Sequence, residues 1–328
     1  MAFLKRIGID TYMLLLVGTV LLGVVLPVRG LSAEILRGVT FWAVALLFFL
    51  YGAKLNSAAV RAGLMNWRLQ ALTFAVTYVM FPVLGLALVT LAGPVLTPET
   101  RLGLLFLAVL PSTVQSSIAF TSMVGGNVPA AICAASVSNL VGVVLTPVLV
   151  TVILHQGGAT VQGDAALKIA VQILLPFVVG QLLRRWIGGW VARHKTLTMV
   201  VDRGSILLIV YSAFSAGTVG GLWHVLSPLD LFGLYVVVAV FLAIAMGAML
   251  ALGRASGMVA EDRAVLFFCG ATKSLASGLP IATALFPAAT LGAVVLPTML
   301  YHLSQLFVCA VLAQRGAARL AAAEPARG

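Results

Sequence analysis

Charged side chains are scarce in this sequence, and acidic ones are the scarcest. Only 9% of the 328 residues are charged, with nine acidic residues against twenty basic ones, whereas 62% are hydrophobic. Soluble globular domains carry about 25% charged residues, so the composition excludes that class of protein. The lipid bilayer is the expected solvent, and the excess of basic residues needs a cause other than nucleic acid binding.

Cysteine and histidine are also rare. The three cysteines, Cys133, Cys269 and Cys309, fall in apolar stretches and show no paired or CxxC spacing. A disulfide framework or a metal site is therefore not expected. The four histidines are spread along the chain and form no nucleophile-base pair or metal cluster. The sequence therefore predicts no enzyme, no catalytic residues and no cofactor.

Apolar runs long enough to cross a membrane recur along the whole chain. A run of about 20 residues spans a hydrocarbon core of roughly 30 Å in helical conformation. We expect an all-α membrane protein with ten transmembrane helices near 10–28, 36–54, 69–93, 102–124, 128–154, 166–187, 199–221, 230–253, 263–286 and 290–313. The first run has no cleavage site behind it, so we interpret it as a span.

The basic residues follow the expected topology. Fifteen lie in segments expected on the cytoplasmic side and four on the opposite side, namely Arg29, Arg37, Arg101 and Lys168. This positive-inside bias requires an even number of spans with both termini in the cytoplasm. We therefore expect a single multi-pass domain in a plasma membrane, the bacterial inner membrane, with a short unstructured tail over 316–328. All nine acids are expected at span ends or in loops.

The twentieth basic residue, Lys273, falls inside the ninth apolar run. A charge at membrane depth costs roughly 2.5 to more than 10 kcal/mol, so such residues usually face a cavity or a partner and mark a pathway. The alternative is that Lys273 lies near the end of a shorter span and reaches the interface. With no acid expected inside a span, its countercharge could be a bound anion.

Helix-breaking residues surround this lysine. Gly270, Gly278 and Pro280, among hydroxyl side chains, predict an interrupted ninth span, and a second polar interruption covers 111–117 of the fourth span. Transporters use such breaks to present carbonyls and helix N-termini to ions and substrates. The alternative for the ninth span is a proline kink packed by small residues.

The two interruptions correspond at a shift of 161 residues, which places Ser112 on Lys273. Five spans precede the polar joint around 155–164 and five follow it, and a repeat with an odd number of spans must be inverted. We expect inverted five-helix repeats at about 1–160 and 161–315, with discontinuous fourth and ninth helices that cross. One lysine and two half-helix N-termini at the crossing favour a small organic anion as substrate.

Several motifs carry a family resemblance. They are Pro111 with Ser116 and Ser117, then Gly126-Asn127-Val128, Ser136-Val137-Ser138 and, in the ninth span, Ser277-Gly278-Leu279. The chain resembles the bile acid:sodium symporter family, and within it the divergent branch with bacterial symporter-like proteins and the seventh vertebrate member of solute carrier family ten. The resemblance implies a ten-span symporter fold of two inverted repeats, divided into a panel and a core domain.

The sodium ligands that the resemblance implies are mostly replaced. The family uses a Ser-Asn pair after the fourth-span break and a Glu with a nearby Gln in the ninth span. Here Ser116 and Ser117 take the first positions, and Cys269–Ser274 contains no acid. Sodium binding by the usual ligands is therefore not expected. We predict that Lys273 takes the place of a bound cation, and a second hypothesis has Lys273 exchanging a proton during transport.

The candidate substrate or ion site lies at the interruptions and on the spans beside them. Its residues are Lys273, Thr272, Ser274, Ser277, Ser112, Thr113, Gln115, Ser116, Ser117, Asn139, Ser136, Ser138, Thr77 and His302. For His302, a hydrogen bond to a neighbouring residue is the alternative. The expected function is secondary active transport of a bile-acid-like or other small carboxylate or sulfate. The alternatives are a channel and a non-transporting regulatory membrane protein involved in ion homeostasis.

Overall fold

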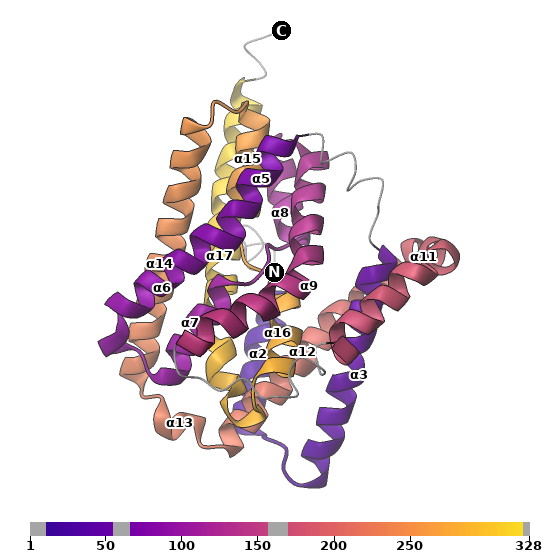
Figure 1. The fold of residues 1–328 in the computed structure, drawn as a ribbon, viewed down its shortest axis with the longest axis vertical. Helices are drawn as coiled ribbons and strands as arrows, with labels where there is room; N and C mark the ends of the chain where they lie inside the picture. Colours follow the sequence, from indigo (N-terminus) through magenta and orange to yellow (C-terminus); the bar gives the residue numbers. More distant parts are fainter. Residues whose placement is uncertain (1–10, 55–65, 157–169, 324–328) are drawn as a thin grey trace.

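The protein is described by a computed structural model that covers residues 11–54, 66–156 and 170–323 (Figure 1). Within these ranges the regular elements are all helical. Among the described residues, seven helical stretches are long and apolar enough to cross a membrane: Leu31–Lys54, Trp67–Leu91, Val128–Ile153, Lys195–Val219, Pro228–Ala255, Ala260–Leu285 and Ala288–Leu320. The predicted all-α membrane fold is confirmed at this level, while ten spans and inverted repeats stay predictions.

Two helical stretches are interrupted in the regions that the sequence indicates. α7 (Pro98–Ala108) and α8 (Gln115–Met123) flank the first interruption, and α15 (Ala260–Gly270) and α16 (Leu275–Leu285) flank the second. Pro280 lies inside α16, so it is not the cause of the second interruption. Both breaks separate two half-helices, whose ends leave backbone groups without intrahelical partners.

A π-helix interrupts a third stretch. α5 (Trp67–Ala75) continues through the π-helix η1 (Val76–Met80) into α6 (Phe81–Leu91), whose second residue is Pro82. A second π-helix, η3 (Ala170–Leu174), leads into α11 (Leu175–Arg193). π-helical turns are frequent at functional sites. They shift the backbone hydrogen bonds by one residue, so a carbonyl can be left without a backbone donor.

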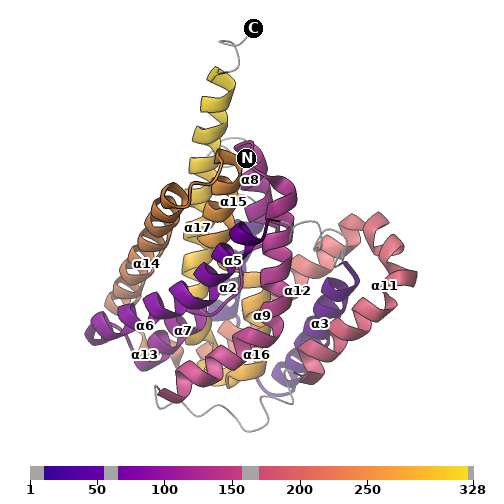
Figure 2. The ribbon, with the colours of Figure 1, turned by 45° about the horizontal axis from the view of Figure 1, so that its top comes forward.

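Helix α11 packs closely against α3 (Leu31–Lys54), and Figures 1 and 2 both show the two helices side by side at one edge of the molecule. A Cβ atom on Gly180 would overlap the carbonyl of Phe49, and one on Gly52 would overlap the carbonyl of Phe177. The two backbones therefore touch directly, as small residues allow in membrane helix pairs.

α12 (Lys195–Val219) packs on α3, on α2 (Thr11–Val25) and on α17 (Ala288–Ala323), and thus connects the α3–α11 pair to the rest of the bundle. The remaining elements are α9 (Val128–Gln156), α14 (Pro228–Ala255), the short α13 (Leu222–Val225) and η2 (Gly93–Val95). Because α17 extends to Ala323, the expected unstructured tail is wrong for 316–323, and 324–328 lies outside the described residues.

Candidate functional site

Lys273 is buried, and its side chain ends among three backbone carbonyls. Nζ donates to Leu110 O at 2.7 Å and to Thr77 O and Ala108 O at 3.0 Å each. The ammonium also lies 4.0 Å from the centroid of the Phe81 ring, which adds a cation–π attraction. With 1% of the residue exposed, Lys273 does not reach the membrane interface. Its direct partners are carbonyl dipoles, and all three N–H donors are used.

The helix breaks explain why these carbonyls are free to accept. Within the π-helix Val76–Met80 a carbonyl pairs with the N–H five residues later, and the residue five positions after Thr77 is Pro82, which has no N–H. Ala108 is the last residue of α7 and Leu110 lies two residues beyond it, where the chain leaves the helix and the usual donors turn away. The ammonium therefore satisfies backbone groups that two helix irregularities leave unpaired.

Gln305 of α17 binds the backbone at the second interruption. Its Oε1 accepts from Lys273 N at 2.8 Å, and its Nε2 donates to Lys273 O at 2.7 Å. Tyr301 OH donates to Ala271 O at 2.8 Å. Gln305 is fully buried but is absent from the predicted site. The available signal was its place three residues after His302, whose Nδ1 lies 3.0 Å from Gln305 Nε2.

Hydroxyl side chains join the two interruptions away from the ammonium. Thr272 Oγ1 lies 3.0 Å from Thr113 Oγ1, 3.2 Å from Ser112 Oγ and 2.9 Å from Ser117 Oγ. Ser112 Oγ also donates to Cys269 O, the penultimate carbonyl of α15, at 2.6 Å. The interruptions therefore meet through side chains that cap each other's backbone.

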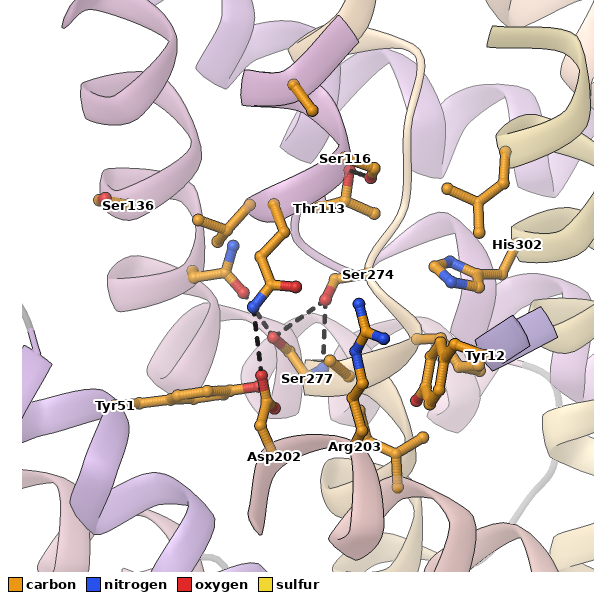
Figure 3. A pocket seen from close by; sticks show the side chains of 18 of the residues that line it. Tyr12, Tyr51, Thr113, Ser116, Ser136, Asp202, Arg203, Ser274, Ser277 and His302 are labelled. Atoms are coloured by element: carbon orange, nitrogen blue, oxygen red, sulfur yellow. Dashed lines mark hydrogen bonds between the residues drawn. The ribbon is translucent and has the colours of Figure 1, made fainter. Parts of the chain in front are cut away.

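A cavity of about 770 Å³ lies beside this meeting point (Figure 3). The first turns of α8 and α16 border it through Gln115, Ser116, Leu275 and Ser277. Helix N-termini carry partial positive charge and bind anions readily. Much of the remaining lining is aromatic, with Tyr12, Phe48, Tyr51, Phe120 and Phe177. The cavity therefore combines apolar surface with a positive rim.

The predicted site residues divide into two groups. Those that line the cavity are Thr113, Gln115, Ser116, Ser136, Asn139, Ser274, Ser277 and His302. Those that are buried and outside its lining are Thr77, Ser112, Ser117, Ser138, Thr272 and Lys273. The cavity group is open to a ligand, whereas the buried group ties the interruptions together. A direct contact between Lys273 and a ligand in the cavity is not part of this arrangement.

A buried carboxylate, that of Asp202, lines the cavity. Asp202 is 7% exposed and accepts from Tyr51 OH at 2.8 Å and from Gln115 Nε2 at 3.4 Å (Figure 3). The sequence places Asp202 near the start of the span expected from 199, and α12 begins about one turn earlier, at Lys195. Asp202 therefore lies well inside the helix.

Comparison with known proteins covers almost the whole chain. The family model described as the SBF-like CPA transporter family (DUF4137) matches residues 10–318. "Uncharacterized protein PA2026" of Pseudomonas aeruginosa is 53% identical over 311 residues, 94% of this chain and 93% of that protein. "Putative symporter YfeH" of Escherichia coli K12 is 44% identical over 307 residues, 94% and 92% of the two chains. "Sodium/bile acid cotransporter 7" of Rattus norvegicus is 28% identical over 281 residues, 84% and 82%.

The family model includes the helices that flank both interruptions and all of the residues that line the cavity. The matches confirm the resemblance to bile acid:sodium symporters and the prediction that the protein is not an enzyme. The helices and the relatives together describe a multi-pass integral membrane protein with a transported small-molecule substrate. The chain belongs to the SBF-like CPA transporter family.

Proposed function

We propose that the protein is a secondary active transporter of a small organic anion, working by alternating access around the crossing of the two interrupted helices. The observation that carries the proposal is the ammonium of Lys273, bound to three carbonyls that helix irregularities leave free. Broken transporter helices use such carbonyls to coordinate a cation. Lys273 supplies that positive charge from the chain itself, so transport proceeds without sodium at this position.

The hydrogen bonds around the interruptions support the inverted repeat. Lys273 donates to Ala108 O, and Ser112 donates to Cys269 O. Both the donors and the acceptors of these two bonds are 161 residues apart in the sequence. A side chain from each interruption therefore binds a carbonyl at the end of the half-helix in the other repeat. A two-fold relation between the halves produces such a reciprocal pair of contacts.

Amide side chains make a similar pair of contacts, although the two amides are 166 rather than 161 residues apart. Asn139 Nδ2 donates to Ser112 O at 2.7 Å, as Gln305 Nε2 donates to Lys273 O at 2.7 Å. Asn139 belongs to α9 and Gln305 to α17, the helices that follow the two interrupted stretches. The pairs support a common architecture for the two halves, with one amide bound to each interruption.

The proposed topology follows from this symmetry. Two inverted five-helix repeats, at about 1–160 and 161–315, give ten spans with the fourth and ninth discontinuous. The excess of basic residues on one side then places both termini in the cytoplasm. We place the protein in the bacterial inner membrane.

The cavity supports an organic anion with an apolar body. Its volume of about 770 Å³ falls in the range of roughly 300–1,000 Å³ that small-molecule sites occupy. Lys54 and Arg203 line it together with the first turns of two half-helices, while the aromatic wall offers apolar surface. A bile-acid-like carboxylate or another small carboxylate or sulfate fits this chemistry, and the rat relative is named for bile acid cotransport.

Counterflow in liposomes tests the proposal. Purified protein is reconstituted with an unlabelled organic anion inside, and uptake of labelled taurocholate, pyruvate and estrone sulfate is measured in sodium medium and in choline medium. Saturable exchange of at least one anion that is equal in the two media is expected. Lys273→Arg should retain more uptake than Lys273→Ala, because the guanidinium keeps a positive charge near the three carbonyls.

The other outcomes of this experiment assign other functions. Non-saturable flux without exchange indicates a channel, and absence of flux for all three anions indicates a regulatory membrane protein. Uptake driven by a sodium gradient alone contradicts the role given to Lys273. Protein-free liposomes and Glu34→Gln, which changes an exposed carboxylate of α3, serve as controls.

A further inference from the structure

We propose that Asp202 is a proton-binding site coupled to the substrate, so that an organic anion and a proton cross the membrane together. The inference rests on the proposed function and adds to it the coupling ion. It starts from the position of Asp202, a buried carboxylate that lines the cavity. Charged residues at membrane depth usually belong to substrate or ion pathways, including proton relays.

The partners of Asp202 come from both sides of the cavity. Tyr51 of α3 donates to Oδ1 at 2.8 Å, and Gln115, the first residue of α8, donates to Oδ2 at 3.4 Å. α3 and α12 pack together, whereas α8 packs against α15 and α17. The carboxylate of α12 therefore bridges α3 and the half-helix that follows the first interruption.

The other ionisable groups of the cavity are placed around this carboxylate. They are Lys54 on α3, Arg203 on α12, Tyr12 on α2 and His302 on α17. Arg203 Cζ lies 4.9 Å from the centroid of the Tyr12 ring. α11 and α16 also pack on α12, and among the described residues their share of the cavity lining contains no ionisable side chain. Lys54 and Arg203 supply the positive charge that acts on Asp202 in the cavity.

Entry of an anion changes this balance. The substrate takes Lys54 and Arg203 as its own partners and brings a negative charge close to Asp202. Two like charges in one poorly hydrated site cannot both be stabilised, so one of them gains a proton. Asp202 takes that proton from the aqueous medium, as hydronium conducted through water in the cavity, and becomes a neutral carboxylic acid. When the anion leaves on the other side, the carboxyl group returns the proton to water there.

The side chains around Asp202 can accommodate both protonation states. Gln115 donates through Nε2 to the carboxylate, and after rotation of its amide Oε1 can accept from the carboxylic acid. The hydroxyl of Tyr51 can likewise donate or accept. Lys273 is a poor candidate for the same role, because its ammonium faces three acceptors and does not line the cavity. The proton site is therefore Asp202, and Lys273 stays a fixed charge.

The test measures proton uptake and proton-driven transport in the same proteoliposomes. Wild type, Asp202→Asn, Asp202→Glu and Glu34→Gln are compared with labelled taurocholate, pyruvate and estrone sulfate. An inward gradient of one pH unit should raise accumulation of a monovalent anion about tenfold for one coupled proton in wild type and in Glu34→Gln. In Asp202→Asn this ratio should fall to about one, and in Asp202→Glu it should stay above one.

A second readout measures proton binding directly. Adding the exchanged anion to weakly buffered protein should cause proton uptake from the medium, seen with a pH dye, in wild type and not in Asp202→Asn. Counterflow exchange in wild type with no effect of the pH gradient overturns the inference and leaves the proposed carrier function intact. The same holds if Asp202→Asn keeps the tenfold ratio. Absence of counterflow for all three anions overturns the carrier function, and the inference with it.

Discussion

The side-chain amide of Gln305 pairs with both backbone polar atoms of Lys273. Oε1 accepts from Lys273 N at 2.8 Å and Nε2 donates to Lys273 O at 2.7 Å, much as a neighbouring strand would. The residue with the buried ammonium is therefore fixed at its backbone by α17 and at its side chain by the carbonyls near α7. Neither end of the residue can shift without breaking contacts at membrane depth.

Replacing Gln305 with leucine should destabilise the fold, because the backbone of Lys273 loses its hydrogen-bond partners. The change leaves a buried N–H and a buried C=O without partners, and each orphan costs about 1–3 kcal/mol. We expect a loss of about 2–4 kcal/mol, measured as a lower thermal unfolding midpoint in detergent. Gln181→Leu is the matched control, because Gln181 Oε1 has no hydrogen-bond partner among the described residues. Equal midpoints for the two variants would contradict the role of Gln305.

Removing the ammonium should create a sodium response that the wild type lacks. Lys273→Ala leaves Thr77 O, Ala108 O and Leu110 O around an empty space, and carbonyl oxygens are ligands that small hard cations accept. We expect the unfolding midpoint of this variant to fall and to recover in part on addition of sodium, but not of choline. The wild-type midpoint should be the same in both salts.

A sodium-dependent midpoint in wild type, or none in Lys273→Ala, contradicts this prediction. Lys273→Met serves as a second variant, because its long side chain fills the space and excludes the ion. It should be destabilised without rescue, since buried carbonyls lose their donor at a cost of about 1–3 kcal/mol each.

Removing the hydroxyl of Thr272 should lower the stability of the protein even when the volume of the side chain is kept. Thr272→Val keeps the shape but removes the atom that Ser112, Thr113 and Ser117 share. We expect a loss of about 1–3 kcal/mol in unfolding free energy and slower counterflow. Thr290→Val is the control, because the hydroxyl of Thr290 is exposed and bonds only within its own turn. An equal effect of the two substitutions would indicate that the hydroxyl cluster contributes nothing.

Adding a methyl group to Gly180 should separate α3 from α11. A Cβ there overlaps the backbone of Phe49, which cannot yield as a flexible side chain would. We expect Gly180→Ala to cost about 1–3 kcal/mol and to lower the unfolding midpoint. Gly189→Ala, on the same helix with nothing within 4 Å of its added Cβ, should instead be neutral or stabilising.

The interruptions could be predicted from the sequence because their causes are local. Pro111 cannot donate a helical hydrogen bond, and the Gly270 region combines weak helix formers with hydroxyls. Pro280 misled the prediction in detail, since a proline inside α16 is tolerated where neighbouring groups satisfy the freed carbonyl. The crossing is therefore visible in the sequence, while the residue that ends each half-helix is not.

The partners of Lys273 and the place of Asp202 could not be predicted, because they depend on contacts between distant parts of the chain. The ammonium binds carbonyls 163 to 196 residues away. The carbonyl of Thr77 is free only because of a π-helix, which no sequence pattern predicts. The sequence places Asp202 near a span end but does not indicate that it is buried beside a cavity. Its partner Tyr51 is 151 residues away.

A cation that belongs to the polypeptide differs from a dissolved ion in one practical respect. A bound sodium ion follows mass action, so its occupancy falls when the surrounding medium is dilute. The ammonium of Lys273 is tethered beside its three carbonyls at a fixed stoichiometry of one per chain. A carrier built in this way keeps the junction of its half-helices filled in fresh water and in brine alike, and needs no ion gradient to assemble it.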